Sequence, residues 1–384
     1  MNPSDVTVLD WQEGGEQRQA RWRSESGWPP PRRVRLADDQ MSADPAYRLA
    51  CEGTALLWRG DFQNARQLLQ AIGRRLDRAA RKPVAAPATP SEVFYRYRQA
   101  QGRRARVLGM LVIEVGGDHG IDLRRAPDLR AACAEAWGPP DGRPCVVALR
   151  ELIGMVGAHE WRKKGVEVPA LGPPPANRIY PHYGVFSPVR GEYLDLIAGA
   201  TLPAVVSPAW DTGTGTGVIA AVLARRGVAR VVATELNPRA LACARDNIGR
   251  LHLQDRIELV EADLFPAGSA PLIVCNPPWL PGKPSSMLEH AVYDPDSRML
   301  RGFLGGLRER LAPGGEGWLV LSDLAEHLGL RTRDELLALF DAGGLVVRER
   351  LDVLPRHPKA ADAADPLAAA RSREVTSLWR LVAD

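Results

Sequence analysis

The feature that most constrains the fold of this chain is a regular alternation of short apolar runs with helical segments over its C-terminal half. Strands that alternate with helices form a mostly parallel sheet with helices on both faces. The last two apolar runs have no long helix between them, so we expect these two strands to pair antiparallel at one edge. The seven predicted strands are Ala204–Ser207, Arg230–Thr234, Ile257–Glu261, Leu272–Cys275, Gly317–Leu321, Leu345–Asp352 and Val375–Val382.

A proline-rich break precedes this alternation and predicts a domain boundary. Residues 168–181 read VPALGPPPANRIYP, and three consecutive prolines are incompatible with a helix or a central strand. We therefore predict three parts for the 384 residues. They are a loosely ordered polar lead-in over residues 1–44, a separate N-terminal domain of mixed α/β structure over 45–170, and the α/β domain with the parallel sheet over 171–384.

A basic stretch lies within the predicted N-terminal domain. Residues 59–106 contain 12 Lys and Arg but only three acidic residues, whereas the whole chain has a net charge of only +4. Apolar residues at helical spacing predict a helix from Asp61, as its N-cap, to Leu76, and prolines predict a linker over 82–90. Arginines on an exposed helix are typical of a nucleic-acid contact surface, but also of an ordinary solvated face. Both interpretations stay open.

Composition disfavours several classes of protein. No apolar run approaches the ~20 residues of a membrane span, and the first residues lack the charged and apolar regions of a secretion signal. The five cysteines are scattered, with no C-x-x-C pair, which is typical of free thiols in a reducing compartment. The seven histidines show no metal-ligand spacing. We therefore expect a cytoplasmic protein without a metal site.

A glycine-rich turn follows the first predicted strand of the α/β domain. Residues 211–217 read DTGTGTG and precede a helical segment. Glycines allow a tight turn and let a ligand lie against the backbone near a helix N-terminus. The dinucleotide pattern G-x-G-x-x-G fails because Val218 stands where its third glycine would be. The turn alone is a weak indication of a nucleotide-like ligand.

Acidic residues at the ends of the next two strands strengthen this interpretation. Glu235 follows the second strand, where a carboxylate can accept hydrogen bonds from both hydroxyls of a ribose. Asp263 follows the third strand, where its side chain could reach an adenine amino group. The sequence thus predicts a nucleoside-containing ligand at the carboxyl edge of the sheet.

The fourth strand runs into Asn276-Pro277-Pro278-Trp279, which carries the most specific signal. Two prolines force the chain out of the sheet and stiffen the turn. The Asn276 amide and the Pro277 carbonyl can then accept both hydrogens of an sp² amino group and favour a pyramidal nitrogen in the transition state. The ring of Trp279 offers a face for stacking a planar substrate. We predict that Asn276, Pro277 and Trp279 form the catalytic group.

These motifs together resemble the class I S-adenosylmethionine-dependent methyltransferases of the small methyltransferase group. That group includes HemK-type protein glutamine methyltransferases and RsmC-like rRNA guanine N2-methyltransferases. The resemblance covers about residues 180–384 and implies a Rossmann-like, seven-stranded, mostly parallel sheet with S-adenosyl-L-methionine as cofactor. It includes Tyr183–Pro188, which resembles the segment that closes over the cofactor. The implied cofactor-binding residues are Phe186, Asp211, Gly213, Gly215, Gly217, Glu235, Asp263 and Asn276.

The sequence departs from the family pattern at two places. Pro208 and Trp210 lie where the first strand normally continues into the acidic residue, which predicts a short strand. The aromatic residue of N-P-P-x is Trp279 rather than the commoner Tyr or Phe.

The predicted function is transfer of the cofactor's methyl group to an sp² amino nitrogen of a macromolecule. A base in rRNA or tRNA is favoured by the basic stretch, which would serve as the contact surface. A protein glutamine amide, as in the HemK-type enzymes, is the alternative that the N-P-P-W motif favours equally. A small-molecule amine and a non-catalytic module that only binds S-adenosylmethionine are two further alternatives.

Overall fold

The computed structural model describes residues 7–80, 89–284, 286–356 and 365–384, which form two compact units. The first unit comprises the described residues up to 80 and Tyr95–Glu160. The second comprises residues 89–94 and Trp161–Asp384. The division therefore falls at 160/161 rather than at the predicted 170/171, and most of the predicted linker 82–90 lies outside the described residues.

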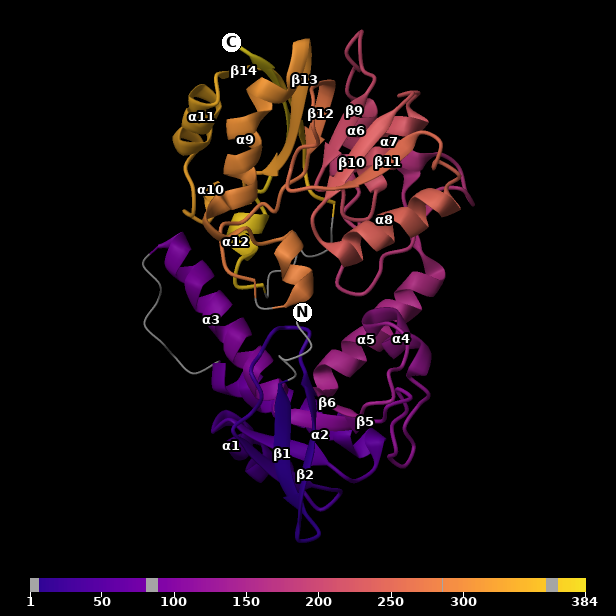
Figure 1. Cartoon of the computed structure of the whole chain (residues 1–384). Coiled ribbons are helices and arrows are strands. Elements are labelled where there is room, and N and C mark those ends of the chain that lie inside the picture. Colours follow the sequence, from indigo (N-terminus) through magenta and orange to yellow (C-terminus); the bar gives the residue numbers. More distant parts are fainter. Residues whose placement is uncertain (1–6, 81–88, 285, 357–364) are drawn as a thin grey trace. The chain divides into compact units, whose positions relative to one another are not determined.

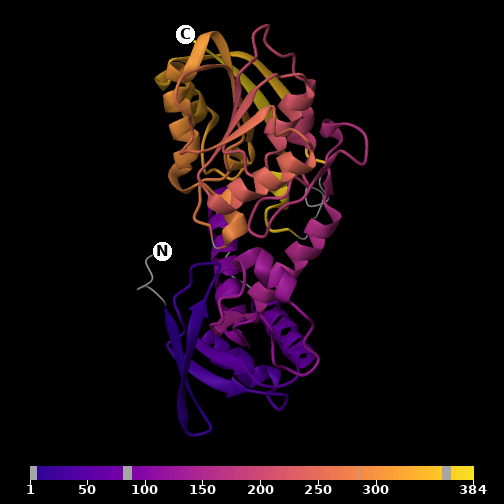
Figure 2. The same ribbon diagram turned by 45° about the vertical axis from the view of Figure 1, so that its right-hand side comes forward.

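The first unit is built around a mixed sheet of six strands in the order β1-β2-β6-β5-β4-β3 (Figures 1 and 2). Two of its pairs, β1 with β2 and β5 with β6, are antiparallel, and the other pairs are parallel. The helix predicted after Asp61 is present as α2. The elements are β1 (Val8–Glu13), β2 (Glu16–Arg23), β3 (Arg33–Ala37), α1 (Ala43–Cys51), β4 (Thr54–Trp58), α2 (Phe62–Ala80), α3 (Pro90–Leu108), β5 (Leu111–Val115), α4 (Arg130–Trp137), β6 (Cys145–Ala148) and α5 (Leu149–Lys164).

The prediction of a loosely ordered lead-in over residues 1–44 is wrong for the part that the structure describes. Strands β1, β2 and β3 all belong to the six-stranded sheet. Strand β2 exposes most of its polar side chains, and Ala20 is its one buried residue. Its backbone pairs with β1 and β6, and two of its eight residues, Ala20 and Trp22, pack into a hydrophobic cluster, so its sequence gives no clear strand pattern.

The second unit contains a sheet of seven strands in the order β11-β10-β9-β12-β13-β15-β14 (Figure 1). The first five are parallel, and β15 pairs antiparallel with both β13 and β14. This order agrees with the predicted mostly parallel sheet with an antiparallel edge. A short two-stranded sheet of β7 and β8 precedes it.

In chain order the second unit contains β7 (Val166–Glu167), η1 (Pro169–Leu171), β8 (Arg178–Ile179), α6 (Glu192–Gly199), β9 (Ala209–Thr212), α7 (Val218–Arg225), β10 (Val231–Glu235), α8 (Pro238–Arg250), β11 (Ile257–Glu261), β12 (Ala270–Cys275), η2 (Met287–Ala291), η3 (Pro295–Ser297), α9 (Arg298–Arg310), β13 (Leu311–Ser322), α10 (Leu324–His327), α11 (Arg333–Ala342), β14 (Leu345–Val353), α12 (Ala368–Arg371) and β15 (Thr376–Ala383).

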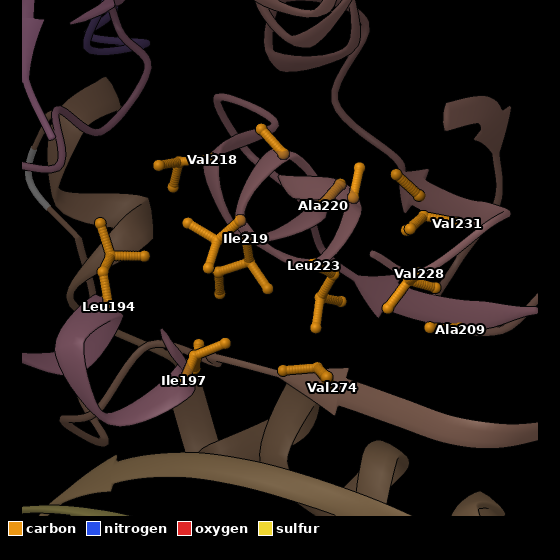
Figure 3. Close-up of a cluster of buried hydrophobic side chains, with 14 of the residues drawn as sticks. Leu194, Ile197, Ala209, Val218, Ile219, Ala220, Leu223, Val228, Val231 and Val274 are labelled. Atoms are coloured by element: carbon orange, nitrogen blue, oxygen red, sulfur yellow. The ribbon is translucent and has the colours of Figure 1, made fainter. Parts of the chain in front are cut away.

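Both faces of this sheet are covered, as a parallel sheet requires. Successive side chains of β12 alternate between two hydrophobic clusters, because side chains of a strand point to opposite faces. Leu272 and Val274 pack with α6 and α7, and Figure 3 shows Val274 facing Ile197 within that cluster. Ile273 and Cys275 pack on the other face, with α9 and α11. Packing on both faces therefore holds the strand ends from which the site loops start.

The first strand of the sheet is not where the sequence predicted it. We predicted residues 204–207, whereas β9 starts after Pro208 and includes Trp210. Val205 is 68% exposed, so its apolar character does not reflect burial. Proline is tolerated at the start of a strand but not inside it, which explains why the strand begins at Ala209 and is short. The other six strands lie within a few residues of their predicted positions, except that β13 begins earlier.

Candidate functional site

The predicted site residues meet at the carboxyl edge of the parallel strands. In the register of the sheet Thr212 of β9 is paired with both Thr234 of β10 and Cys275 of β12. The residues that follow these three are Gly213, Glu235 and Asn276. The glycine turn, Glu235 and the N-P-P-W motif therefore lie side by side at the ends of three neighbouring strands.

The glycine turn adopts the conformation that only glycine takes without strain. Gly213, Gly215 and Gly217 have φ angles of 72°, 57° and 81°. A Cβ at Gly215 would meet nothing within 4 Å, so the backbone there faces open space. A Cβ at Gly213 would instead lie 2.4 Å from the terminal methyl of Met299. The turn therefore presents an accessible backbone at Gly215.

Asp211 lies under the turn rather than on its surface. Its carboxyl is fully buried, and Oδ2 accepts hydrogen bonds from the Thr214 hydroxyl (2.5 Å) and the Ala220 backbone N–H (2.9 Å). Burial raises its pKa to about 7. Oδ1 is buried without a hydrogen-bond partner among the described residues. This geometry gives Asp211 the role of holding the turn against the start of α7.

Glu235 is held in place by the same turn and by its own backbone. Its Oε2 accepts a hydrogen bond from Gly215 N–H (3.0 Å), and its Oε1 accepts from Leu236 N–H (3.0 Å) and Asn237 N–H (2.9 Å). Asn237 is the N-cap of α8, where its side chain accepts from Arg239 N–H (2.9 Å). The Glu235 carboxylate is partly exposed and has lone pairs left for further donors.

Asp263 and Phe186 are the remaining residues of the predicted cofactor site. The Asp263 carboxylate forms an ion pair with Arg298 at the start of α9 (2.9 Å), and both side chains are largely exposed. Phe186 is half-buried and follows Val185, which packs against Ala240 and Cys243.

The N-P-P-W motif forms a rigid corner at the end of β12. The Trp279 indole N–H donates a hydrogen bond to Asn276 Oδ1 (2.8 Å). Trp279 is half-buried and packs against both hydrophobic clusters of the sheet. The chain then pairs Leu280 with Tyr293, which ties the motif to the segment before α9. Burial raises the pKa of the preceding Cys275 thiol, so this cysteine is a packing residue rather than a nucleophile.

Sequence reasoning missed two groups that position this corner. The Asp294 carboxylate, whose pKa is raised by burial, accepts hydrogen bonds from Met299 N–H (2.8 Å) and Leu300 N–H (3.3 Å) at the start of α9. Its position in D-P-D-S before a helical run is a helix-start signal that could have identified it. Arg190 lies over the Trp279 ring, with its guanidinium carbon 5.3 Å from the ring centre. No local signal marks Arg190 as a contact of this corner, because Trp279 and Glu374 are distant from it in sequence.

The described residues show no cluster of three or more His, Cys, Asp or Glu with the geometry of a metal site. Over the same residues, no helix combines the length and the apolar composition needed to span a bilayer.

Comparison with known proteins finds similarity within the second unit. Residues 177–343 match the model of the methyltransferase small domain. The chain is 39% identical over 110 residues to release factor glutamine methyltransferase of Cereibacter sphaeroides. The aligned region spans 28% of this chain and 36% of that protein. The protein of the same name from Deinococcus radiodurans is 33% identical over 175 residues, 44% of this chain and 56% of that protein.

A relative with a different name matches about as well. The tRNA1(Val) (adenine(37)-N6)-methyltransferase of Shewanella loihica is 30% identical over 122 residues, 29% of this chain and 50% of that protein. The chain thus spans only about one third to just over half the length of these three relatives. Residues 177–343, which contain the glycine turn, Glu235 and the N-P-P-W corner, thus match the methyltransferase small domain.

Proposed function

We propose that this chain transfers the methyl group of S-adenosylmethionine to the amino nitrogen of a base in RNA. The proposal rests on the register of the sheet, which places Gly213, Glu235 and Asn276 side by side at the ends of three adjacent parallel strands. A cofactor site and an amino-group site are then neighbours, as direct methyl transfer requires. The family of residues 177–343 supports the same reaction.

The residues of the turn fit the cofactor. The open backbone at Gly215 leaves room for a methionine moiety, and its glycine has no Cβ to fill that space. The Glu235 carboxylate is already oriented by three backbone N–H groups and has lone pairs left for ribose hydroxyls. Asp211 would hold the turn from below, Asp263 would contact the adenine, and Phe186 would lie in the segment that closes over the cofactor. When bound, S-adenosylmethionine supplies a methyl group activated by its sulfonium.

Asn276 and Pro277 would hold the nitrogen that attacks this methyl group. Asn276 Oδ1 and the Pro277 carbonyl oxygen are acceptors, so each can take one hydrogen of a planar amino group. Holding both hydrogens away from the base plane localises the nitrogen lone pair for attack. An N–CH₃ bond forms as the S–CH₃ bond breaks, and the nitrogen releases one proton to solvent. Positioning supplies most of the catalysis, because the electrophile is already activated.

The basic stretch supports RNA as the acceptor. In the first unit Arg74 and Arg78 lie exposed on α2, and Arg103 and Arg106 lie exposed on α3. These helices are neighbours, because Arg104 of α3 donates a hydrogen bond to the Gly73 carbonyl of α2 (3.3 Å). Arginines from two adjacent helices give a positive surface of the kind that binds phosphates.

A protein glutamine amide is the second candidate, and the relatives named release factor glutamine methyltransferase favour it. The amide NH₂ of glutamine is also planar, so the N-P-P-W corner would hold it in the same way. Methylation of RNA and methylation of a protein would therefore differ in what the first unit binds. The chemistry at Asn276 would be the same.

Transfer of radioactive methyl groups tests the proposal. Purified protein is incubated with methyl-labelled S-adenosylmethionine and a cell extract, which is then divided and treated with ribonuclease or protease. Label that ribonuclease releases supports RNA, whereas label that protease releases shows the protein alternative. Asn276→Ala is the matched control and should give almost no label. Cofactor binding without transfer to any fraction would identify a non-catalytic module and contradict the proposal.

A further inference from the structure

The Asn276 side chain is not free to rotate in this structure. Its Oδ1 accepts the hydrogen bond from the Trp279 indole N–H at 2.8 Å. An indole nitrogen is only a donor, so the amide must turn its oxygen and not its NH₂ toward the ring. The amide oxygen keeps a second lone pair, and the hydrogen bond from Trp279 fixes the direction in which that lone pair points.

Tryptophan is the aromatic residue that can do this at position 279. Phenylalanine has no polar hydrogen, and the hydroxyl of tyrosine projects from the far end of its ring. The indole places an N–H beside the five-membered ring, within reach of a residue three positions earlier. The presence of Trp279 in place of the commoner Tyr or Phe thus supplies a hydrogen-bond donor to Asn276.

The Trp279 ring is itself held by a charged group. The Arg190 guanidinium carbon lies 5.3 Å from its ring centre, within the range of a cation–π contact. Arg190 Nε donates to Glu192 Oε1 (3.0 Å) and its Nη2 donates to Glu374 Oε1 (3.1 Å). The side chains of Glu192 and Glu374 are 3% and 1% exposed, so both carboxylates depend on Arg190 for charge neutralisation.

Glu374 connects this arrangement to the sheet. Its Oε1 also accepts a hydrogen bond from the Ser322 hydroxyl (2.8 Å), and Ser322 is the last residue of β13. The backbone beside it is fixed as well, because Val375 N–H donates to Asp323 Oδ1 (2.7 Å). Arg190 is therefore anchored to the end of a central strand rather than to a mobile loop.

We infer that Trp279 is a positioning residue that fixes the acceptor oxygen of Asn276, with Arg190 and Glu374 holding its ring in place. The inference rests on the proposed function, because Asn276 is there the group that holds the substrate nitrogen. It assigns Trp279 a role different from stacking on the substrate. One face of the ring is directed to Arg190, and the indole edge is directed to Asn276.

A double-mutant cycle tests the inference kinetically. Trp279→Phe keeps a ring for stacking but removes the N–H, so kcat should fall about tenfold, the effect of losing one hydrogen bond. The KM for S-adenosylmethionine should stay within about twofold, because the cofactor residues are untouched. In an Asn276→Ala background, Trp279→Phe should lower kcat little further, because the hydrogen bond between the two side chains is already lost. Trp161→Phe, at an exposed tryptophan, is the matched control.

The acceptor in these assays is the extract fraction, RNA or protein, that takes up label from wild-type protein. Equal losses from Trp279→Phe in both backgrounds would show that the ring acts independently of Asn276 and would overturn the inference. A change confined to KM for the acceptor would indicate stacking on the substrate and would overturn it too.

A spectroscopic measurement separates the inference from the proposed function. The indole N–H resonance of Trp279, assigned in ¹⁵N-tryptophan-labelled protein by its loss in Trp279→Phe, should shift upfield in Asn276→Ala, where the acceptor is missing. The resonance of Trp161 should not move. An unchanged Trp279 resonance would overturn the inference whatever the activity. A shifted resonance in a protein that methylates no fraction would leave the hydrogen bond established and would reject the proposed function instead.

Discussion

The carboxylate of Glu235 accepts a hydrogen bond from the backbone N–H of Gly215 over 3.0 Å. The acid at the end of β10 and the turn at the end of β9 are therefore one preorganised unit. Each keeps the other in position before any ligand is present, which lowers the ordering cost of binding.

The first prediction concerns the affinity for S-adenosylmethionine. Glu235→Ala removes a charged acceptor from the ribose and loosens the turn, so binding should weaken by roughly 1.5–3 kcal/mol. Calorimetry with purified protein measures this directly. Glu261→Ala removes an exposed acid from the end of β11 and is the matched control. Unchanged affinity in folded Glu235→Ala would remove Glu235 from the cofactor site.

The second prediction separates chemistry from binding. Asn276→Ala should lower kcat by roughly 10²–10³, as loss of one preorganised partner of a transition state does. Affinity for S-adenosylmethionine should stay within a few-fold, because the turn and Glu235 are intact. Single-turnover rates and calorimetry on the same preparation give both quantities. Near wild-type turnover would show that another group holds the amino nitrogen.

The third prediction follows from the pKa of Asp211, which burial raises to about 7. The folded protein then binds a proton that the unfolded chain, with a pKa of 3.8, releases. The Asp211 contribution to stability is therefore greatest at low pH and falls as pH rises from about 4 through 7. The slope is up to about 1.4 kcal/mol per pH unit in that range.

Asp211→Asn is neutral at every pH and should lose this slope. Denaturant unfolding of both proteins at several pH values between 4 and 8 measures the difference between them. If the difference in unfolding free energy stays constant over that range, Asp211 does not change protonation on folding.

The fourth prediction concerns the stability of the corner that holds Trp279. Arg190→Leu would leave the buried carboxylates of Glu192 and Glu374 without their cation, at a cost of about 3–5 kcal/mol in unfolding free energy. Adding Glu374→Gln should recover part of this loss, since one of the two unpaired charges is then removed. Additive losses in the double variant, measured by thermal unfolding, would show that the two residues are not coupled.

The fifth prediction concerns RNA. Replacing Arg74, Arg75 and Arg78 together would test the basic stretch, but Arg75 forms an ion pair with Asp44 (2.5 Å) and is a poor choice. The exposed pair Arg74 and Arg78 is the sharper test. Changing both to Ala should weaken binding to total RNA and lower the salt slope by roughly 0.7 for each single-strand phosphate that the variant no longer neutralises.

A filter-binding titration at two or more salt concentrations measures that slope. Arg245→Ala with Arg308→Ala removes two exposed charges from the second unit and serves as the control. An equal effect of both double variants would assign the binding to net charge rather than to the α2 surface. A weak and flat salt response of the wild-type protein would favour a protein acceptor.

The sheet of the second unit was largely predictable because inner strands such as β10, β12 and β15 are buried on both faces and read as apolar runs. Strand β11 lies at Ile257–Glu261, as predicted, whereas Glu235 is the last residue of β10 and Asn276 directly follows β12. The failures have physical causes. Val205 is apolar but exposed, because Pro208 delays the strand. Strand β2 is polar but ordered, because it pairs with β1 and β6 and needs only Ala20 and Trp22 for its apolar packing.

Interactions between residues distant in sequence could not be predicted. Arg190 and Glu374 are separated by 184 positions and meet only because β13 and β15 bring Glu374 beside the start of α6. Likewise Asp211 looks like a ligand-binding acid in the sequence, whereas its burial beneath the turn depends on how α7 packs. Motifs locate the ends of strands, but side-chain partners depend on the assembled sheet.

The shared register of Thr212, Thr234 and Cys275 implies an unequal tolerance to different kinds of mutation. Substitutions inside these strands change packing but leave Gly213, Glu235 and Asn276 level with one another. Deleting one residue from β10 would instead withdraw Glu235 by about 3.3 Å and turn its side chain to the opposite face. Length changes in this lineage should therefore accumulate in the connections between the strands and their helices, and the strands themselves should keep their lengths while their sequences diverge.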